Sequence, residues 1–142
     1  MKELFDVHCH MVPGVDDGAA DLEESLAMLK MQHEDGVRKI IITPHYRRRM
    51  FETPAKKVHE QFLKLQEAAK KEYPDMSLYL GCELHSNMDL QDILEKRKYV
   101  TMAGSSYVLL EFSEGDSAQH IRERVYNVLN RLSRMWSAIR QR

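Results

Sequence analysis

The stretch DVHCHMVPGVDDG, residues 6–18, brings two histidines and two acids into a short space. His8 and His10 are one residue apart at the end of an apolar run, and Asp16 and Asp17 follow in a loop between two glycines. Because residues two apart on a strand face the same side, both imidazoles can reach one metal ion. A single His-x-His pair also fits packed or solvent-facing histidines, so the pair alone leaves both interpretations open.

Three more candidate ligands, His45, Glu83 and Glu111, each stand at or just past the end of an apolar run. The carboxyl ends of strands are where active sites are built in barrels and open α/β sheets. Unpaired carboxylates that converge on one place repel one another and are costly to desolvate, and bound cations remove that cost. Imidazoles and carboxylates without thiolates favour Mn, Fe or Zn, and two bridged ions suit displacement at phosphorus. The residues therefore predict metal-dependent hydrolysis of a phosphate ester.

The elements that must position these side chains follow a repeated β-α pattern. Apolar, β-branched runs alternate with amphipathic segments, so we expect an α/β fold with a mainly parallel sheet. Asp21 with Glu24 forms a capping box at the start of the first helix, and Pro54 is expected at the first helical position of the second. Strands are expected at 4–8, 39–43, 77–82 and 107–112, and helices at 21–36, 54–73, 88–96 and 117–132.

The composition fits one domain that recognises its partners locally. The chain has 142 residues, 43% of them hydrophobic, and a net charge of −1. This nearly neutral balance gives no general attraction for nucleic acid or an anionic membrane. No apolar stretch is long enough to cross a bilayer, and the first ten residues lack a signal-peptide core, so we expect a cytoplasmic protein without membrane insertion.

The two cysteines, Cys9 and Cys82, are expected to be free thiols that pack as small apolar residues. A cysteine-dependent phosphatase needs an arginine close behind its nucleophile to hold the phosphate. The residues six positions after the two cysteines are Val15 and Met88. The sequence therefore gives no support to a thiolate mechanism.

The motifs DVHCHMVPGVDDGAADLEESLAML, ITPH, GCEL and LLEF resemble the successive motifs of the PHP (polymerase and histidinol phosphatase) family. Within it, PGVDDGA, ITPH and MFETP are similar to the branch of bacterial capsule and exopolysaccharide tyrosine-protein phosphatases. The resemblance implies the N-terminal part of a distorted, TIM-like (β/α) barrel over residues 1–132, followed by an atypical basic tail at 133–142.

The same resemblance implies up to three metal ions, most often manganese, with iron and zinc as alternatives. It implies that a metal-bridged hydroxide hydrolyses phosphotyrosine on a protein substrate, a bacterial tyrosine autokinase of polysaccharide assembly. The family's metal ligands correspond here to His8, His10, Asp17, His45, Glu83 and Glu111.

Family members continue into a His-Pro-Glu-Arg type motif and an Asp-x-His motif, both metal-binding, and neither is present in these 142 residues. We therefore expect a truncated or frame-shifted product of a longer gene, with fewer than three ions bound. An incomplete barrel also leaves a sheet edge and apolar surface exposed, which favours self-association.

Several alternatives remain open at this level. Arg47 and Arg48 follow His45 and can hold a substrate phosphate, although a solvated basic loop explains them equally well. One of Asp16 and Asp17 can be a turn residue, and Asp17 is the expected ligand. Besides a tyrosine phosphatase, the residues suit a phosphoesterase acting on a small ester such as histidinol phosphate, or an inactive fragment with a partial metal site.

Overall fold

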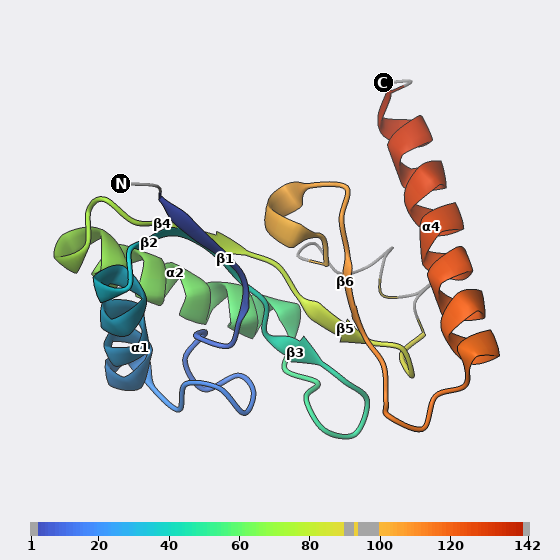
Figure 1. Cartoon of the computed structure of the whole chain (residues 1–142), viewed down its shortest axis with the longest axis horizontal. Coiled ribbons are helices and arrows are strands. Elements are labelled where there is room, and N and C mark those ends of the chain that lie inside the picture. The colour runs from blue at the N-terminus through green and yellow to red at the C-terminus, as the bar shows by residue number, and fades with distance from the viewer. Residues whose placement is uncertain (1–2, 90–92, 94–99, 141–142) are drawn as a thin grey trace.

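The computed structural model describes residues 3–89, 93 and 100–140. Strands and helices alternate along most of the chain, which confirms the α/β class (Figure 1). The elements are β1 (Leu4–Cys9), α1 (Leu22–Glu34), β2 (Val37–Ile42), β3 (His45–Tyr46), α2 (Ala55–Glu72), β4 (Ser77–Leu80), β5 (Glu83–His85), the 3₁₀ helix η1 (Met102–Gly104), β6 (Leu109–Glu111) and α4 (Ala118–Arg140).

The strands form two parallel three-stranded sheets, in the orders β1-β2-β4 and β3-β5-β6. About four strands are expected from the sequence, and the described residues form six, because the second and third expected strands are each followed after a short break by a further short strand, β3 and β5. Pro44 cannot donate a ladder hydrogen bond, and Gly81 lies where a Cβ would come within 3.2 Å of Ile41. The Gly81 N–H still donates to Ile42 O at 2.8 Å, so backbone pairing continues across the interruption.

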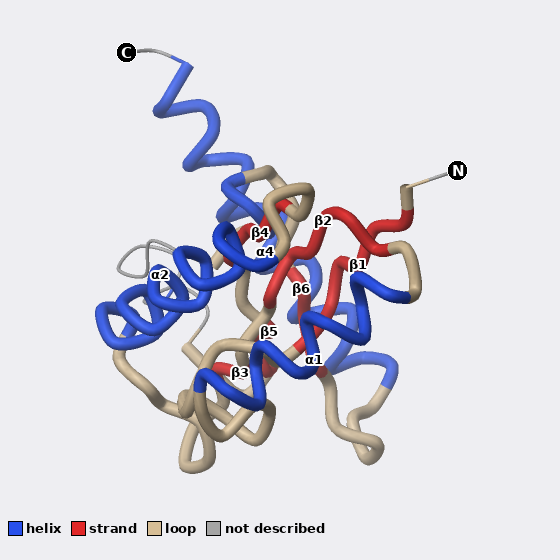
Figure 2. Tube along the Cα trace, turned by 90° about the vertical axis from the view of Figure 1, so that its left-hand side faces the viewer, coloured by secondary structure: helices blue, strands red, loops and turns tan. Residues whose placement is uncertain are grey.

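The first sheet packs against α1 and α2, and the second against α4 (Figures 1 and 2). Leu29 of α1 and Leu65 of α2 are fully buried against the sheet residues Ile40 and Ile42. The predicted apolar face of α2 is confirmed, since all four of its residues are buried: Val58, Phe62, Leu65 and Ala69. Burial of this apolar surface stabilises the sheet whose ends carry the candidate ligands.

The helix ends agree in part with the sequence. Asp21 caps α1 as predicted, with its Oδ1 accepting the Glu24 N–H at 2.9 Å. Pro54, with ψ of 138°, is the N-cap of α2 rather than its first helical residue, because its carbonyl accepts the first helical hydrogen bond. α4 continues to Arg140, beyond the expected end at residue 132, since no glycine or proline follows to stop it. The helix expected at 88–96 falls mainly outside the described residues.

The β1 strand is an edge strand, hydrogen-bonded within the described residues to β2. Leu4, Phe5 and Val7 are between 51% and 60% exposed, which is unusual for apolar residues on a strand. On α4, Tyr126 and Leu129 are also exposed. Of the helices that the structure describes, none combines the length and the apolar character needed to span a bilayer.

We expect the 142-residue chain to self-associate through β1, because an unpaired strand edge with exposed apolar side chains is a template for strand addition. Sizing chromatography with light scattering should show a species larger than a monomer, and a Phe5→Glu, Val7→Lys variant should shift it toward the monomer. Leu63→Lys, on an exposed position of α2, is the control and should leave the distribution unchanged. A monomeric wild-type chain at micromolar concentration would contradict this expectation.

Candidate metal centre

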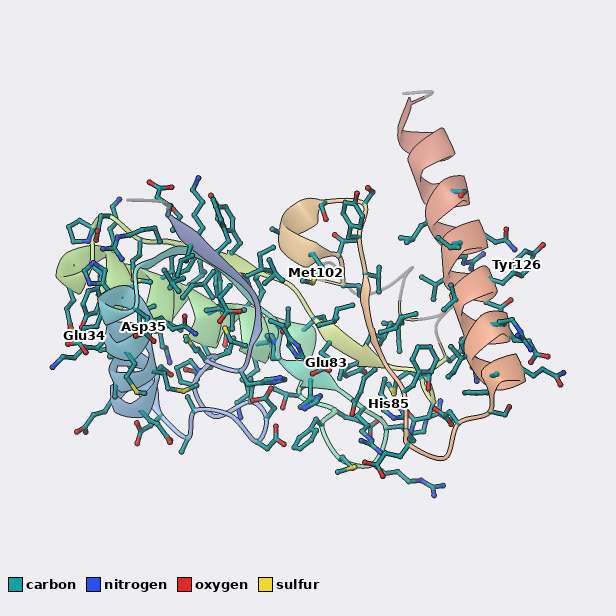
Figure 3. The ribbon with its side chains drawn as sticks, in the orientation of Figure 1. Glu34, Asp35, Glu83, His85, Met102 and Tyr126 are labelled. Carbon is teal, nitrogen blue, oxygen red and sulfur yellow. The ribbon has the colours of Figure 1, made fainter. Side chains whose placement is uncertain are left out.

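Glu83, the first residue of β5, is labelled in Figure 3. Its carboxylate lies close to the imidazoles of three histidines. Its Oε2 lies 3.1 Å from His8 Nε2 and 3.2 Å from His10 Nε2. The same oxygen lies 3.2 Å from His45 Nδ1. His8 is on β1, His10 is the first residue after the end of β1, and His45 is the first residue of β3. The parallel strands therefore bring their donors to a single edge.

Six side chains form three overlapping groups, and within each group the potential ligand atoms lie within 4.8 Å of one another. The shared members of these groups make the cluster suitable for adjacent ions rather than one isolated ion. All six residues named from the sequence are present, so the structure brings the predicted set together. The groups are His8, His10 and Glu83; His10, Asp17 and His45; and His45, Glu83 and Glu111.

Two buried atoms of this cluster have no hydrogen-bond partner among the described residues, His45 Nδ1 and Glu111 Oε2. They lie 3.6 Å apart. Buried polar atoms without a partner are costly, and an imidazole nitrogen and a carboxylate oxygen are both good donors to transition-metal ions. The arrangement therefore fits metal cations, which would satisfy both atoms.

Asp16 orients His10 and does not belong to the three ligand groups. Its side chain is fully buried and its Oδ2 lies 2.9 Å from His10 Nδ1. The same carboxylate accepts the backbone N–H groups of His45 and Gly18. Because the Nδ1–H of His10 donates to Asp16, the Nε2 atom that faces Glu83 carries a lone pair. A carboxylate commonly orients a metal-binding histidine in this way.

The contacts of Asp16 also set its charge. Burial raises the pKa of the Asp16 carboxyl, but the hydrogen bonds from His10, His45 and Gly18 outweigh burial and leave the pKa below its usual value. The hydrogen bond to Asp16 in turn raises the pKa of His10. From the sequence, one of the two acids is expected to be a turn residue, and Asp16 does accept the N–H of Gly18 two residues on. Asp16 also contacts His10 and His45, whereas Asp17 is largely exposed. The glycines on either side of the two acids are the sequence feature that indicates a tight loop at this position.

The two candidate arginines occupy different environments. Arg47 is half-buried, with its Nη1 3.2 Å from Glu111 Oε1, while Arg48 is exposed to solvent. The backbone of Arg47 pairs with that of Phe51, whose ring stacks on His45 with centroids 5.1 Å apart. The loop after β3 therefore keeps Arg47 beside the cluster, and contact of either arginine with phosphate stays a prediction.

Both cysteines are buried free thiols, as the sequence predicts. Burial, assisted by the charges of Asp6 and Asp16, raises the pKa of Cys9 to about 12. A thiol with this pKa is protonated at neutral pH and is a poor nucleophile. The reactive groups at this edge are therefore the imidazoles and carboxylates.

The fold and the cluster together define an α/β protein built around a candidate metal centre at its strand ends. The chain belongs to the CpsB/CapC family of capsular polysaccharide synthesis, whose family model matches residues 4–132. This result confirms the family branch that the sequence motifs indicate.

Two relatives of this chain are named tyrosine-protein phosphatases. The chain is 40% identical over 126 residues to tyrosine-protein phosphatase CpsB of Streptococcus pneumoniae, covering 89% of this chain and 52% of the relative. It is 30% identical over 109 residues to tyrosine-protein phosphatase YwqE of Bacillus subtilis, covering 77% of this chain and 43% of the relative. The chain thus spans about half the length of the curated relatives it matches.

A solved structure is similar over the same extent. It comes from crystal structures of YwqE from Bacillus subtilis and CpsB from Streptococcus pneumoniae, described as unique metal-dependent tyrosine phosphatases. The TM-score is 0.78 at 27% sequence identity, over 89% of this chain and 51% of that chain. The fold described above is therefore similar to that of about half of this solved structure.

Gly18 provides a test of how the acidic loop is positioned. A Cβ at this residue would lie 2.0 Å from His10 O and 2.5 Å from His10 Cβ, so Gly18→Ala must displace the backbone that carries His10. We expect a loss of about 1–3 kcal/mol of stability and less bound metal, measured by thermal unfolding and elemental analysis. Gly115→Ala, where no atom lies within 4 Å of the added Cβ, is the control. Wild-type stability and metal content in Gly18→Ala would show that the loop does not position His10.

Proposed function

We propose that this chain is a metal-dependent protein-tyrosine phosphatase that acts in the regulation of capsule or exopolysaccharide synthesis. The single observation that carries the proposal is the convergence of three imidazole nitrogens on Glu83 Oε2. Manganese is the proposed metal, with iron and zinc as alternatives, because the donors are imidazoles and carboxylates without thiolate. The proposed ligands are His8, His10, Asp17, His45, Glu83 and Glu111.

When bound, the ions would supply an activated water and stabilise the charge that develops on the phosphoryl oxygens. The chain's own residues have separate tasks. Asp16 holds His10 in a ligating orientation through the 2.9 Å contact. Arg47 compensates the charge of Glu111 through Nη1, and its guanidinium would also hold a phosphoryl oxygen of the substrate. Arg48 would meet the phosphate from the solvent side.

The proposed substrate is a phosphotyrosine protein, more specifically a bacterial tyrosine autokinase of polysaccharide assembly. The names of the relatives support a phosphotyrosine substrate and a connection with capsule synthesis. On this proposal the chain acts in the cytoplasm, and residues 1–132 carry the metal chemistry. The basic stretch expected as a tail from residue 133 on is instead continuous with α4 as far as Arg140.

The metal site is tested first. Purified wild-type chain loaded with manganese should retain transition metal after desalting, and a His8→Ala, His10→Ala double variant should lose most of it because one ligand group loses two of its three donors. His59→Ala, on α2 and outside the three ligand groups, is the matched control and should keep the wild-type content. Equal metal in the double variant and the control would overturn the assignment.

The activity is tested on the same samples. The manganese-loaded wild-type chain should release phosphate from a phosphotyrosyl peptide faster than from histidinol phosphate, and a chelator should abolish the reaction. Faster turnover of histidinol phosphate would favour a small-molecule phosphoesterase. Bound metal without hydrolysis of either compound would overturn the phosphatase proposal and identify the chain as an inactive metal-binding fragment.

The thiol prediction separates this mechanism from that of cysteine-dependent phosphatases. Since Cys9 is buried and protonated, iodoacetamide should leave the manganese-dependent rate unchanged, and so should a Cys9→Ala, Cys82→Ala variant that retains the wild-type circular dichroism spectrum. A rate that falls in step with thiol alkylation would contradict the assignment of the chemistry to the metal cluster.

A further inference from the structure

His85, the last residue of β5, is buried and lies outside the three ligand groups. Its Nδ1 accepts the backbone N–H of Asn87 at 3.1 Å. A backbone N–H can only donate, so Nδ1 carries no proton and the ring proton is on Nε2. The Nε2–H then donates to Ser113 Oγ, 3.1 Å away. The local backbone therefore fixes the tautomer of His85 and directs its donor to the loop after β6.

The same loop is joined to the end of β5 by further hydrogen bonds. Ser113 N–H donates to Asp116 Oδ2 at 2.8 Å, and Ser86 Oγ donates to the same oxygen at 3.4 Å. Ser86 N–H donates to Glu111 O at 2.9 Å. His85 is also the strand partner of Glu111 in the parallel pairing of β5 with β6. In Figure 3, His85 lies on the side of β5 toward this loop.

These contacts bind together the two strands that carry carboxylates of the cluster. Glu83 stands two residues before His85, and Ser113 stands two residues after Glu111. The Glu111 side chain is itself held within the described residues by Arg47 at Oε1, while its buried Oε2 has no hydrogen-bond partner. Its place opposite His45 therefore depends on where β6 and the following loop lie.

We propose that His85, through Ser113, is a positioning residue that keeps the Glu111 carboxylate at ligand distance from His45 and Glu83. The inference rests on the proposed metal site and adds a role that the ligand groups do not include. Removal of groups that position a metal ligand without contacting the metal commonly lowers metal affinity by about 10–100-fold.

Substitutions of His85 can separate its two hydrogen bonds. In His85→Asn the side-chain carbonyl can still accept the Asn87 N–H, but the amide does not reach Ser113. In His85→Gln the amide nitrogen takes the place of Nε2 and restores the donor to Ser113. Ser113→Ala removes the acceptor without touching the imidazole. Ser105→Ala, which removes a hydroxyl that accepts the Tyr107 N–H at 3.1 Å, is the matched control.

The readout is a manganese titration followed by electron paramagnetic resonance, with thermal unfolding measured in parallel. We expect His85→Asn and Ser113→Ala each to weaken one class of site about tenfold, while His85→Gln and Ser105→Ala stay close to wild type. Glu111→Gln should weaken the same class, and His85→Asn added to Glu111→Gln should cause no further loss, because both changes act on one ligand.

Each outcome decides the inference. Wild-type manganese affinity in His85→Asn and Ser113→Ala would overturn it, and so would losses from His85→Asn and Glu111→Gln that add in full. If His85→Asn fails to fold, Ser113→Ala and the His85→Gln comparison decide the question alone. Absence of manganese binding by the wild-type chain would overturn both the proposed function and this inference. Manganese affinity that is the same in wild type and in the variants would overturn this inference only.

Discussion

The crowding of donors around Glu83 Oε2 is the constraint on which the rest of this structure depends. Three imidazole nitrogens lie 3.1–3.2 Å from one carboxylate oxygen, and the Glu111 carboxylate is close to the same place. Such a cluster has an excess of lone pairs and negative charge in a partly buried setting, which costs free energy unless cations occupy it. The strands must therefore be rigid enough to keep the donors together when no ion is bound.

Backbone pairing that continues across the two interruptions supplies that rigidity. Pro44 and Gly81 divide two long strands, yet the pairing resumes directly with His45 opposite Glu83. The first sheet is anchored by the apolar core beneath it, and the short second sheet carries His45 and Glu83 at the starts of β3 and β5 and Glu111 at the end of β6. Burial in the core thus stabilises a strand edge on which unfavourable groups converge, as is usual for active sites on parallel sheets.

The features of this protein that can be predicted from its sequence are those that short-range patterns determine. The spacing of His8 and His10 and the positions of the strands were sufficient to indicate one edge of ligands, and the family resemblance supplied the remaining set. The short strands β3 and β5 are not predictable from the sequence, because two or three residues are too few to show an alternating or apolar pattern of their own. The contacts of Asp16 with His45 and of Arg47 with Glu111 are not predictable from the sequence, because these partners are distant along the chain and meet only in the folded protein.

The central claim is that Glu83 is the shared ligand of a metal cluster rather than a carboxylate held by three histidines. A crystal of the chain soaked in manganese and measured at the manganese absorption edge tests this claim most directly. If Glu83 is a metal ligand, anomalous density will lie at ligand distance from its carboxylate, with His8 and His10 Nε2 directed at the same peak. Well-ordered density for Glu83 and the three imidazoles in their present contacts, without an anomalous peak between them, would contradict it.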